Sequence, residues 1–254
     1  MIYDIQKASI LKRISAWMLD TIVLLIVIAG VAGLLSALVG YDGYSTRLDA
    51  HYAAYEKEYG IVFDITQEEY EAMTQAGKDN YDAAYEALIA NEDVLYVYNM
   101  LINLTLIIVT FSILAAYLIL EFAVPIFLKN GQTLGKKVFG IAVIRTNGVR
   151  MNHISLFIRT LLGKFTVETM IPVLVAIMLL FNMAGLGGTI LVFGLFAAQL
   201  ALLIATPTHA LIHDKLADTV TVDLASQMIF DTEQDLLEYK KRMSAEEAAK
   251  QSYF

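Results

Sequence analysis

Ionisable side chains inside long apolar stretches are the residues of this sequence that could do chemistry. Asp20 and Glu121 are the only charged residues in the apolar runs 14–39 and 94–128. A charged side chain at the bilayer centre costs about 2.5–3.5 kcal/mol on insertion scales, so such residues are kept near the boundary or in pairs. The pattern fits a salt-bridge clasp that fixes helix register, and equally a cation or proton site.

Further charged residues fall at a similar depth, near one end of each apolar run. Arg13 and Asp20 are seven residues apart, so they return to one face of a helix with Asp20 about 10 Å deeper. Lys164 and Glu168 are four apart on one helix and can pair directly. We therefore predict one polar cluster, which consists of Arg13, Asp20, Glu121, Arg159, Lys164, Glu168, His213 and Asp214.

Several classes of function find no support in the composition. The chain has no cysteine, and its net charge of -8 provides no basic footprint for nucleic acid. His209 and His213 have a spacing that could hold zinc, but histidines just beyond an apolar span usually lie at the membrane interface. No Ser–His–Asp set shares one apolar segment, so we expect no enzyme activity, no metal centre and no cofactor.

The apolar runs themselves indicate a membrane protein, because 57% of the residues are hydrophobic and only 17% are charged. A spanning helix needs about 20 mainly apolar residues. Segment 154–164 carries Arg159 and Lys164, and it is expected to be an interfacial helix that leads into the third span. We predict an all-α membrane protein with four transmembrane helices, at about 14–39, 94–128, 165–181 and 186–206.

Basic residues in the short flanks predict the orientation, because they resist export. Segment 129–153, between the second span and the interfacial helix, contains five basic residues and no acid, whereas segment 40–93 has three basic residues against thirteen acids. Both termini are therefore expected in the cytoplasm (N-in/C-in) and segment 40–93 outside. The first run is too long for a cleavable signal core and is expected to remain as an anchor.

Segment 40–93 is too long to be a bare connection and is expected to be a small acidic helical insertion. Thr66 and Glu69 resemble a capping box, and apolar residues from Tyr70 to Leu88 recur at helical spacing. The insertion could gather cations or dock a partner, but its acidity is also what any exported, soluble loop would show.

The segments expected in the cytoplasm are a basic loop and the C-terminal tail. Gly131-Gln132-Thr133-Leu134-Gly135-Lys136-Lys137 lacks the spacing and the Ser or Thr of a phosphate-binding loop. Residues 141–151 alternate around Asn147-Gly148 and predict a short cytoplasmic hairpin. The tail is expected to be an amphipathic or partly disordered helix. We divide the chain into 1–39 (first span), 40–93 (insertion), 94–222 (core) and 223–254 (tail).

Three segments resemble the RDD family of small membrane proteins, which is named for one arginine and two aspartates. They are KRISAWMLD at 12–20, GQTLGKKVFGI at 131–141 and HDKLADTV at 213–220. The resemblance identifies Arg13, Asp20 and Asp214 as the named residues, and Asp218 stands where a small residue, often Gly, is expected. The family's loop motif corresponds to Gly131, Gln132, Gly135, Lys136, Lys137 and Gly140.

The resemblance implies a role in transport, with monovalent cations exchanged for protons. Our hypothesis is that the Asp20, Glu121 and Asp214 carboxylates handle the cation or proton and that Arg13 holds them in place. It also implies a multi-pass protein of the bacterial cytoplasmic membrane, whose partners would be the lipid bilayer, cations and protons. Four spans are few for a complete secondary transporter, so a homo-oligomer is expected. The alternative is a non-transporting scaffold or accessory subunit that binds a protein or lipid.

Overall fold

A computed structural model gives the fold and describes residues 4–180 and 184–251. The chain forms two compact units. The first contains the residues up to 28 and from 113 onward, and the second contains residues 29–112.

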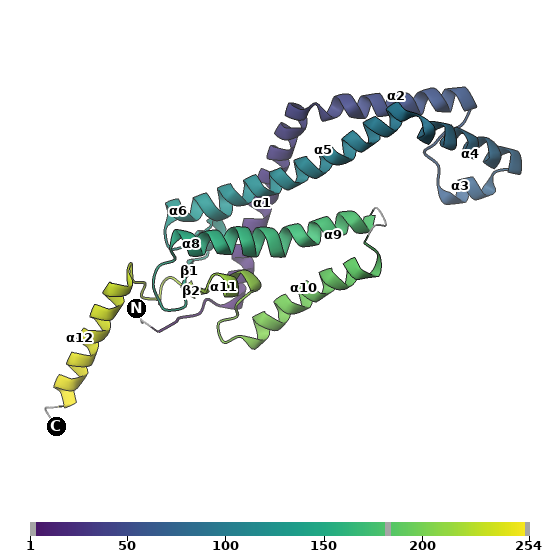
Figure 1. The fold of residues 1–254 in the computed structure, drawn as a ribbon. Coiled ribbons are helices and arrows are strands. Elements are labelled where there is room, and N and C mark those ends of the chain that lie inside the picture. Colours follow the sequence, from purple (N-terminus) through teal and green to yellow (C-terminus); the bar gives the residue numbers. More distant parts are fainter. Residues whose placement is uncertain (1–3, 181–183, 252–254) are drawn as a thin grey trace. The chain divides into compact units, whose positions relative to one another are not determined.

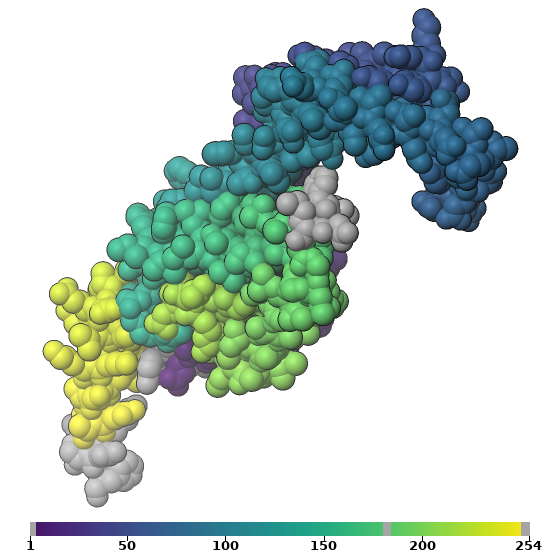
Figure 2. All heavy atoms as spheres, turned by 45° about the vertical axis from the view of Figure 1, so that its right-hand side comes forward, coloured from purple at the N-terminus to yellow at the C-terminus, as the bar shows by residue number. Residues whose placement is uncertain are grey.

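Four helical runs are long and apolar enough to cross a membrane, which confirms the predicted class and number of spans. The first is α1 (Ile10–Val39). The second is α5 (Glu92–Tyr117), continued by η1 (Leu118–Ala123) and α6 (Val124–Leu128). The third combines α8 (His153–Phe157), η2 (Ile158–Met170) and α9 (Ile171–Leu180), and the fourth is α10 (Gly185–Ala205). Figure 1 shows α9 and α10 side by side, and Figure 2 shows their atoms as one continuous green surface.

Segment 154–164, predicted as an interfacial helix that leads into the third span, is helical and continuous with that span. This segment is the first half of one continuous run that starts at His153. Its basic residues do not reach out to the boundary, because Arg159 is 3% exposed and pairs inside the protein. The predicted end of the third span at Phe181 and the turn from Asn182 lie outside the described residues.

Two stretches of these runs are π-helical, η1 with six residues and η2 with thirteen. The wider π turn shifts the side chains that follow it and often marks functional sites. Here Thr160 in η2 donates to the carbonyl oxygen of Glu121 in η1 at 2.9 Å, which ties the two π segments together. Four of the eight predicted cluster residues lie in these two stretches.

A two-stranded antiparallel sheet lies in the first unit. Strand β1 (Ile141–Arg145) pairs with β2 (Thr219–Asp223), and Ile141 is opposite Asp223. The predicted turn at Asn147-Gly148 is present, but it leads back to β1 only through the single bridge between Ile144 and Arg150. The predicted hairpin is therefore corrected: the main partner of β1 is the distant strand β2, which completes a core of Ala142, Ile144, Val220 and Val222.

The second unit contains α2 (Tyr41–Tyr59), α3 (Gln67–Ala72) and α4 (Gln75–Ala90). The capping box of Thr66 and Glu69 is confirmed at the start of α3. The predicted apolar face is split between two helices, because Met73 and Thr74 are extended and Thr74 caps α4. Its aromatic residues still pack together, with Tyr70 and Tyr81 edge to face at 5.4 Å.

The tail begins against the sheet and ends in α12 (Glu233–Gln251). Phe230 and Leu236 pack with Val149, so this end of the tail is part of the first unit's core. The rest of α12, yellow in Figures 1 and 2, projects from that unit, and its described side chains are mostly exposed.

Candidate functional site

Asp20 binds the loop motif directly. The motif's short helix α7 (Leu134–Val138) starts at the N-cap residue Thr133. The hydroxyl of Thr133 donates to Oδ2 of Asp20, and the backbone N–H of Gly135 donates to Oδ1 at 2.7 Å. The Lys136 ammonium lies 3.7 Å from the same carboxylate. Free N–H groups at a helix start attract negative charge, so Asp20 fixes the start of α7 against α1.

Gly135 is required for this close approach. A Cβ atom at this position would lie 2.3 Å from the backbone oxygen of Ala16 and 2.9 Å from the Asp20 carboxylate. No real side chain fits at these distances, so only glycine lets α7 reach α1. This close contact explains why the second glycine of the motif, Gly135, is glycine.

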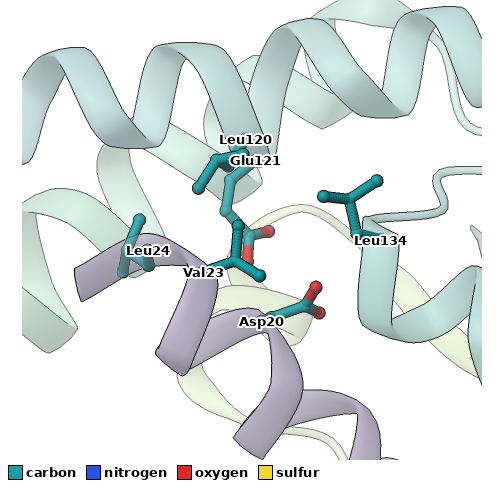
Figure 3. Close-up of a pocket in the computed structure, with 6 residues that line it drawn as sticks. All are labelled: Asp20, Val23, Leu24, Leu120, Glu121 and Leu134. Carbon is teal, nitrogen blue, oxygen red and sulfur yellow. The ribbon is translucent and has the colours of Figure 1, made fainter. Parts of the chain in front are cut away.

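Glu121 lies next to Asp20 and has its own cation. Its carboxylate is 2.6 Å from the ammonium of Lys164. Figure 3 shows the Asp20 and Glu121 carboxylates facing one small pocket of about 10 Å³, which Val23, Leu24, Leu120 and Leu134 close on the apolar side. A space of this size holds about one water molecule or one small ion.

Asp214 lies between the two arginines of the cluster. Arg159 donates to its Oδ1 from Nε at 3.2 Å and from Nη2 at 2.9 Å, and Arg13 is 3.5 Å from Oδ2. Thr219 also donates to Oδ1, at 3.3 Å. The neighbouring His213 and the two guanidinium groups hold the pKa of Asp214 well below its usual range against the effect of burial. Asp214 is therefore ionised and saturated with donors.

His213 joins this group to the third helix. Its backbone N–H donates to Glu168 at 3.0 Å, and its ring Nδ1 is 2.7 Å from the same carboxylate. Burial lowers the pKa of His213, against the effect of the nearby Asp214 and Glu168 carboxylates. Gly163 permits this packing, since a Cβ atom there would lie 2.5 Å from the His213 Cβ atom.

The ion pairs differ from those that helical spacing allows. Lys164 and Glu168 do not pair with each other: Lys164 binds Glu121, and Glu168 binds His213. Arg13 and Asp20 share a helix, yet Arg13 turns toward Asp214 and the carbonyl oxygen of His209. Sequence spacing showed which residues share a depth, and packing between elements decided which of them pair.

One cavity of about 690 Å³ gathers most of the cluster. All four membrane helices line it, together with α7 and α11 (Ile212–Leu216). Asp214 is not in its lining and lies behind Arg13 and Arg159. Seven of the eight predicted residues line this cavity, namely Arg13, Asp20, Glu121, Arg159, Lys164, Glu168 and His213.

Lys136 is a cavity residue that sequence reasoning placed only in the loop motif. It lies among Asp20 of α1, Glu121 of η1, and Lys164 and Arg159 of η2. Burial, followed by repulsion from Lys164, lowers the pKa of Lys136 to about 8. The residue can therefore exchange its proton near neutral pH. The sequence signal for Lys136 is Thr133, a residue type that favours the helix N-cap and that places Lys136 in the first turn of α7.

The other motif residues shape the loop. Gln132 is buried and donates to the carbonyl oxygen of Ile141 at 2.9 Å, while Lys137 is exposed. Gly131 and Gly140 have positive φ angles of 60° and 63°, which favour glycine. Asp218 also has a positive φ of 51°, which accounts for the family's small residue there, and aspartate tolerates this conformation.

The charges in the site are balanced within the protein. Four carboxylates, Asp20, Glu121, Glu168 and Asp214, have basic partners or His213 within 4 Å. No group of three or more metal-binding side chains occurs among the described residues, and His209 bonds the carbonyl oxygen of Leu203. Such an arrangement can release a carboxylate only when a neighbouring cation leaves or loses its charge.

The helices and the buried ionic cluster define a multi-pass α-helical membrane protein. The sequence model of the RDD family matches residues 7–218, which include Arg13, Asp20, the loop motif and Asp214. The chain belongs to the RDD family. No curated protein and no solved structure matches it.

Proposed function

We propose that this protein exchanges monovalent cations for protons across the bacterial cytoplasmic membrane, with Asp20 and Glu121 as the exchanging carboxylates. The observation that carries the proposal is the cavity between the four membrane helices. It brings both acids together with the titratable Lys136 and with three further basic residues, Arg13, Arg159 and Lys164. Ionisable residues inside membrane segments commonly mark ion pathways. Both termini lie in the cytoplasm in this proposal, so the cavity lies in the inner leaflet.

Lys136 supplies the coupling to protons. When Lys136 is protonated, its ammonium balances the Asp20 carboxylate while Lys164 balances Glu121, so the small pocket has no net negative charge to bind a cation. When it loses its proton, the small pocket between the two carboxylates gains a negative charge and accepts a cation. Protonation of Lys136 and binding of a cation in the small pocket therefore exclude each other, and this mutual exclusion is what exchange requires.

Asp214 was expected to be an exchanging carboxylate, and in this proposal it has a structural role instead. Arg13 and Arg159 both hold it, and it lies outside the cavity lining. Replacing its two cations would leave several buried charges unpaired, which is strongly unfavourable. Asp214 therefore positions the arginines, and the exchange is left to Asp20 and Glu121.

The experiment is flux in proteoliposomes that contain the purified full chain and an imposed pH gradient. Sodium, potassium and lithium are offered in turn, and proton movement is followed with an entrapped pH dye. The proposal expects cation-dependent proton release from protein-containing vesicles and none from protein-free vesicles. A homo-oligomer is expected as the active form, and cross-linking within the same vesicles measures it.

The rival function is a scaffold or accessory subunit, and the folded second unit favours it. This unit has an exposed aromatic residue, Tyr85, on an acidic helical insertion. Vesicles without any cation flux, together with a stable partner whose recovery is lost when residues 43–91 are deleted, would support this role over exchange.

A further inference from the structure

The 690 Å³ cavity opens sideways at α1 and α10. Trp17 of α1 and Phe196 of α10 both line the cavity, yet they are 65% and 61% exposed. Ile14 and Leu200 show the same combination, with 48% and 43% exposure. In a membrane, the exposed faces of spanning helices meet lipid, so the cavity communicates with the bilayer.

The walls of the cavity are of two kinds. Five of the six lining residues on α10 are apolar, and Gln199 is the exception, while the charged lining side chains come from α1, α7, η1 and η2. A volume of this size is within the roughly 300–1,000 Å³ of organic ligand sites. A monovalent ion with its waters would use the charged end and would leave the apolar wall without a partner. An amphiphile uses both.

The charged end contains a cation that can bind an anionic headgroup. Four cationic side chains line the cavity, Arg13, Lys136, Arg159 and Lys164. Asp214 behind the lining binds both arginines, so the headgroup is assigned to Lys164. The recorded ion pair of the Lys164 ammonium is with Glu121, and an ammonium has three donors. Lys164 therefore keeps donors for a phosphate or carboxylate oxygen while its own ion pair stays intact.

We infer that this cavity binds a membrane amphiphile with an anionic headgroup, which enters between α1 and α10 and places its headgroup at Lys164 and its hydrocarbon along α10. The headgroup chemistry is a phosphate or carboxylate, which an anionic phospholipid or a free fatty acid could supply. This binding needs no ion exchange, so it stands or falls separately from the transport function.

Trp17 makes the binding measurable, because it is the only tryptophan of the chain and lines the cavity. The full chain is placed in phosphatidylcholine vesicles, and its fluorescence is followed as brominated lipid replaces plain lipid. Separate arms use brominated phosphatidylglycerol, brominated phosphatidylcholine and a brominated fatty acid. About 0.5 M salt screens attraction to the exposed basic surface.

Half-maximal quenching is expected at a mole fraction about five-fold lower for an anionic brominated lipid than for brominated phosphatidylcholine. The arm with the stronger effect identifies the phospholipid or the fatty acid as the source. Coincident curves for all three lipids at high salt would overturn the inference, because they describe ordinary contact with bulk lipid.

Charge variants locate the headgroup. Lys164→Gln should remove the preference, whereas Lys137→Gln, at an exposed lysine of α7, should leave it unchanged. The double variant Glu121→Gln, Lys164→Gln leaves no unpaired charge if the single variant does not fold, and it should lose the preference as well. A preference that persists in the double variant would contradict the assignment of the headgroup to this cavity.

Discussion

At the scale of single residues, the two aspartates of the family play unlike parts. Asp20 receives neutral donors from Thr133 and Gly135, and its cation Lys136 is 3.7 Å away. Asp214 is bound by two guanidinium groups, one of them within 2.9 Å. Asp20 can change partners because Lys136 is distant and can lose its charge. Asp214 cannot, because both of its arginines stay charged. The first is suited to exchange and the second to structure.

Asp214→Asn should destabilise the protein strongly, because it leaves Arg13 and Arg159 buried without a counter-charge. Breaking a buried pair of this kind costs about 3–5 kcal/mol. Thermal unfolding in detergent measures the loss. Asp218→Asn is the control, since it is exposed and asparagine tolerates its positive φ, and it should change Tm little. Equal Tm values for wild type and Asp214→Asn would contradict the saturated pairing.

The lowered pKa of Asp214 also gives the direction of the acid response. The folded state binds fewer protons than the unfolded state, so the contribution of Asp214 is full above the unfolded value of about 3.9. It is lost as the pH falls toward the folded pKa. Acid titration of Tm should therefore show a step below about pH 4 in wild type that is missing in Asp214→Asn.

Lys136 predicts a pH step on the alkaline side. Its pKa of about 8 lies below the ordinary 10.5, so cation exchange should rise as the pH passes through about 8. Lys136→Arg should stay inactive up to pH 10, because the guanidinium keeps its charge. Lys136→Met should lose the step, and the exposed neighbour variant Lys137→Met should keep it. A step that survives in Lys136→Met would exclude Lys136 as the proton group.

At the scale of elements, the contact of α7 with α1 is the one that a small change should break. Gly135→Ala would place a Cβ atom 2.3 Å from the backbone of Ala16. Backbone cannot yield as a flexible side chain does, so a loss of roughly 1–3 kcal/mol is expected. Gly194→Ala in α10 is the matched control, since no atom lies within 4 Å of its added Cβ. Thermal unfolding that ranks the two variants equally would refute the close contact.

The sequence predicts elements well where the signal is local. The four spans, the Thr66 capping box and the turn at Asn147-Gly148 all depend on neighbouring residues, and the structure has each of them. Pairings between distant segments were not readable in this way. The partner of β1 is more than seventy residues away, and its choice depends on a shared apolar core that alternation alone does not reveal.

The same limit applies to the site. Charge and depth were enough to select seven residues that line one cavity, because few ionisable residues are tolerated in apolar runs. The pairings of Lys164 with Glu121 and of Glu168 with His213 depend on how two π-helical segments and α11 pack. Helical spacing assumes 3.6 residues per turn, and η1 and η2 depart from it.

At the scale of the whole molecule, every residue that lines the cavity belongs to the first unit. Replacing residues 43–91 of the insertion by a short Gly-Ser linker should therefore leave cation exchange within about two-fold of wild type. Flux per inserted protein measures this, with insertion checked by protease protection. Loss of exchange in a correctly inserted variant would mean that the insertion contributes to transport.

The central claim is that Asp20 changes partner between Lys136 and a cation, and sodium-dependent proton flux in proteoliposomes tests it most directly. Asp20→Asn keeps the shape and an acceptor oxygen for Thr133 but removes the charge. We predict at least a ten-fold loss of flux in Asp20→Asn, with Asp42→Asn in the exposed insertion unchanged. Undiminished flux in Asp20→Asn would contradict the account.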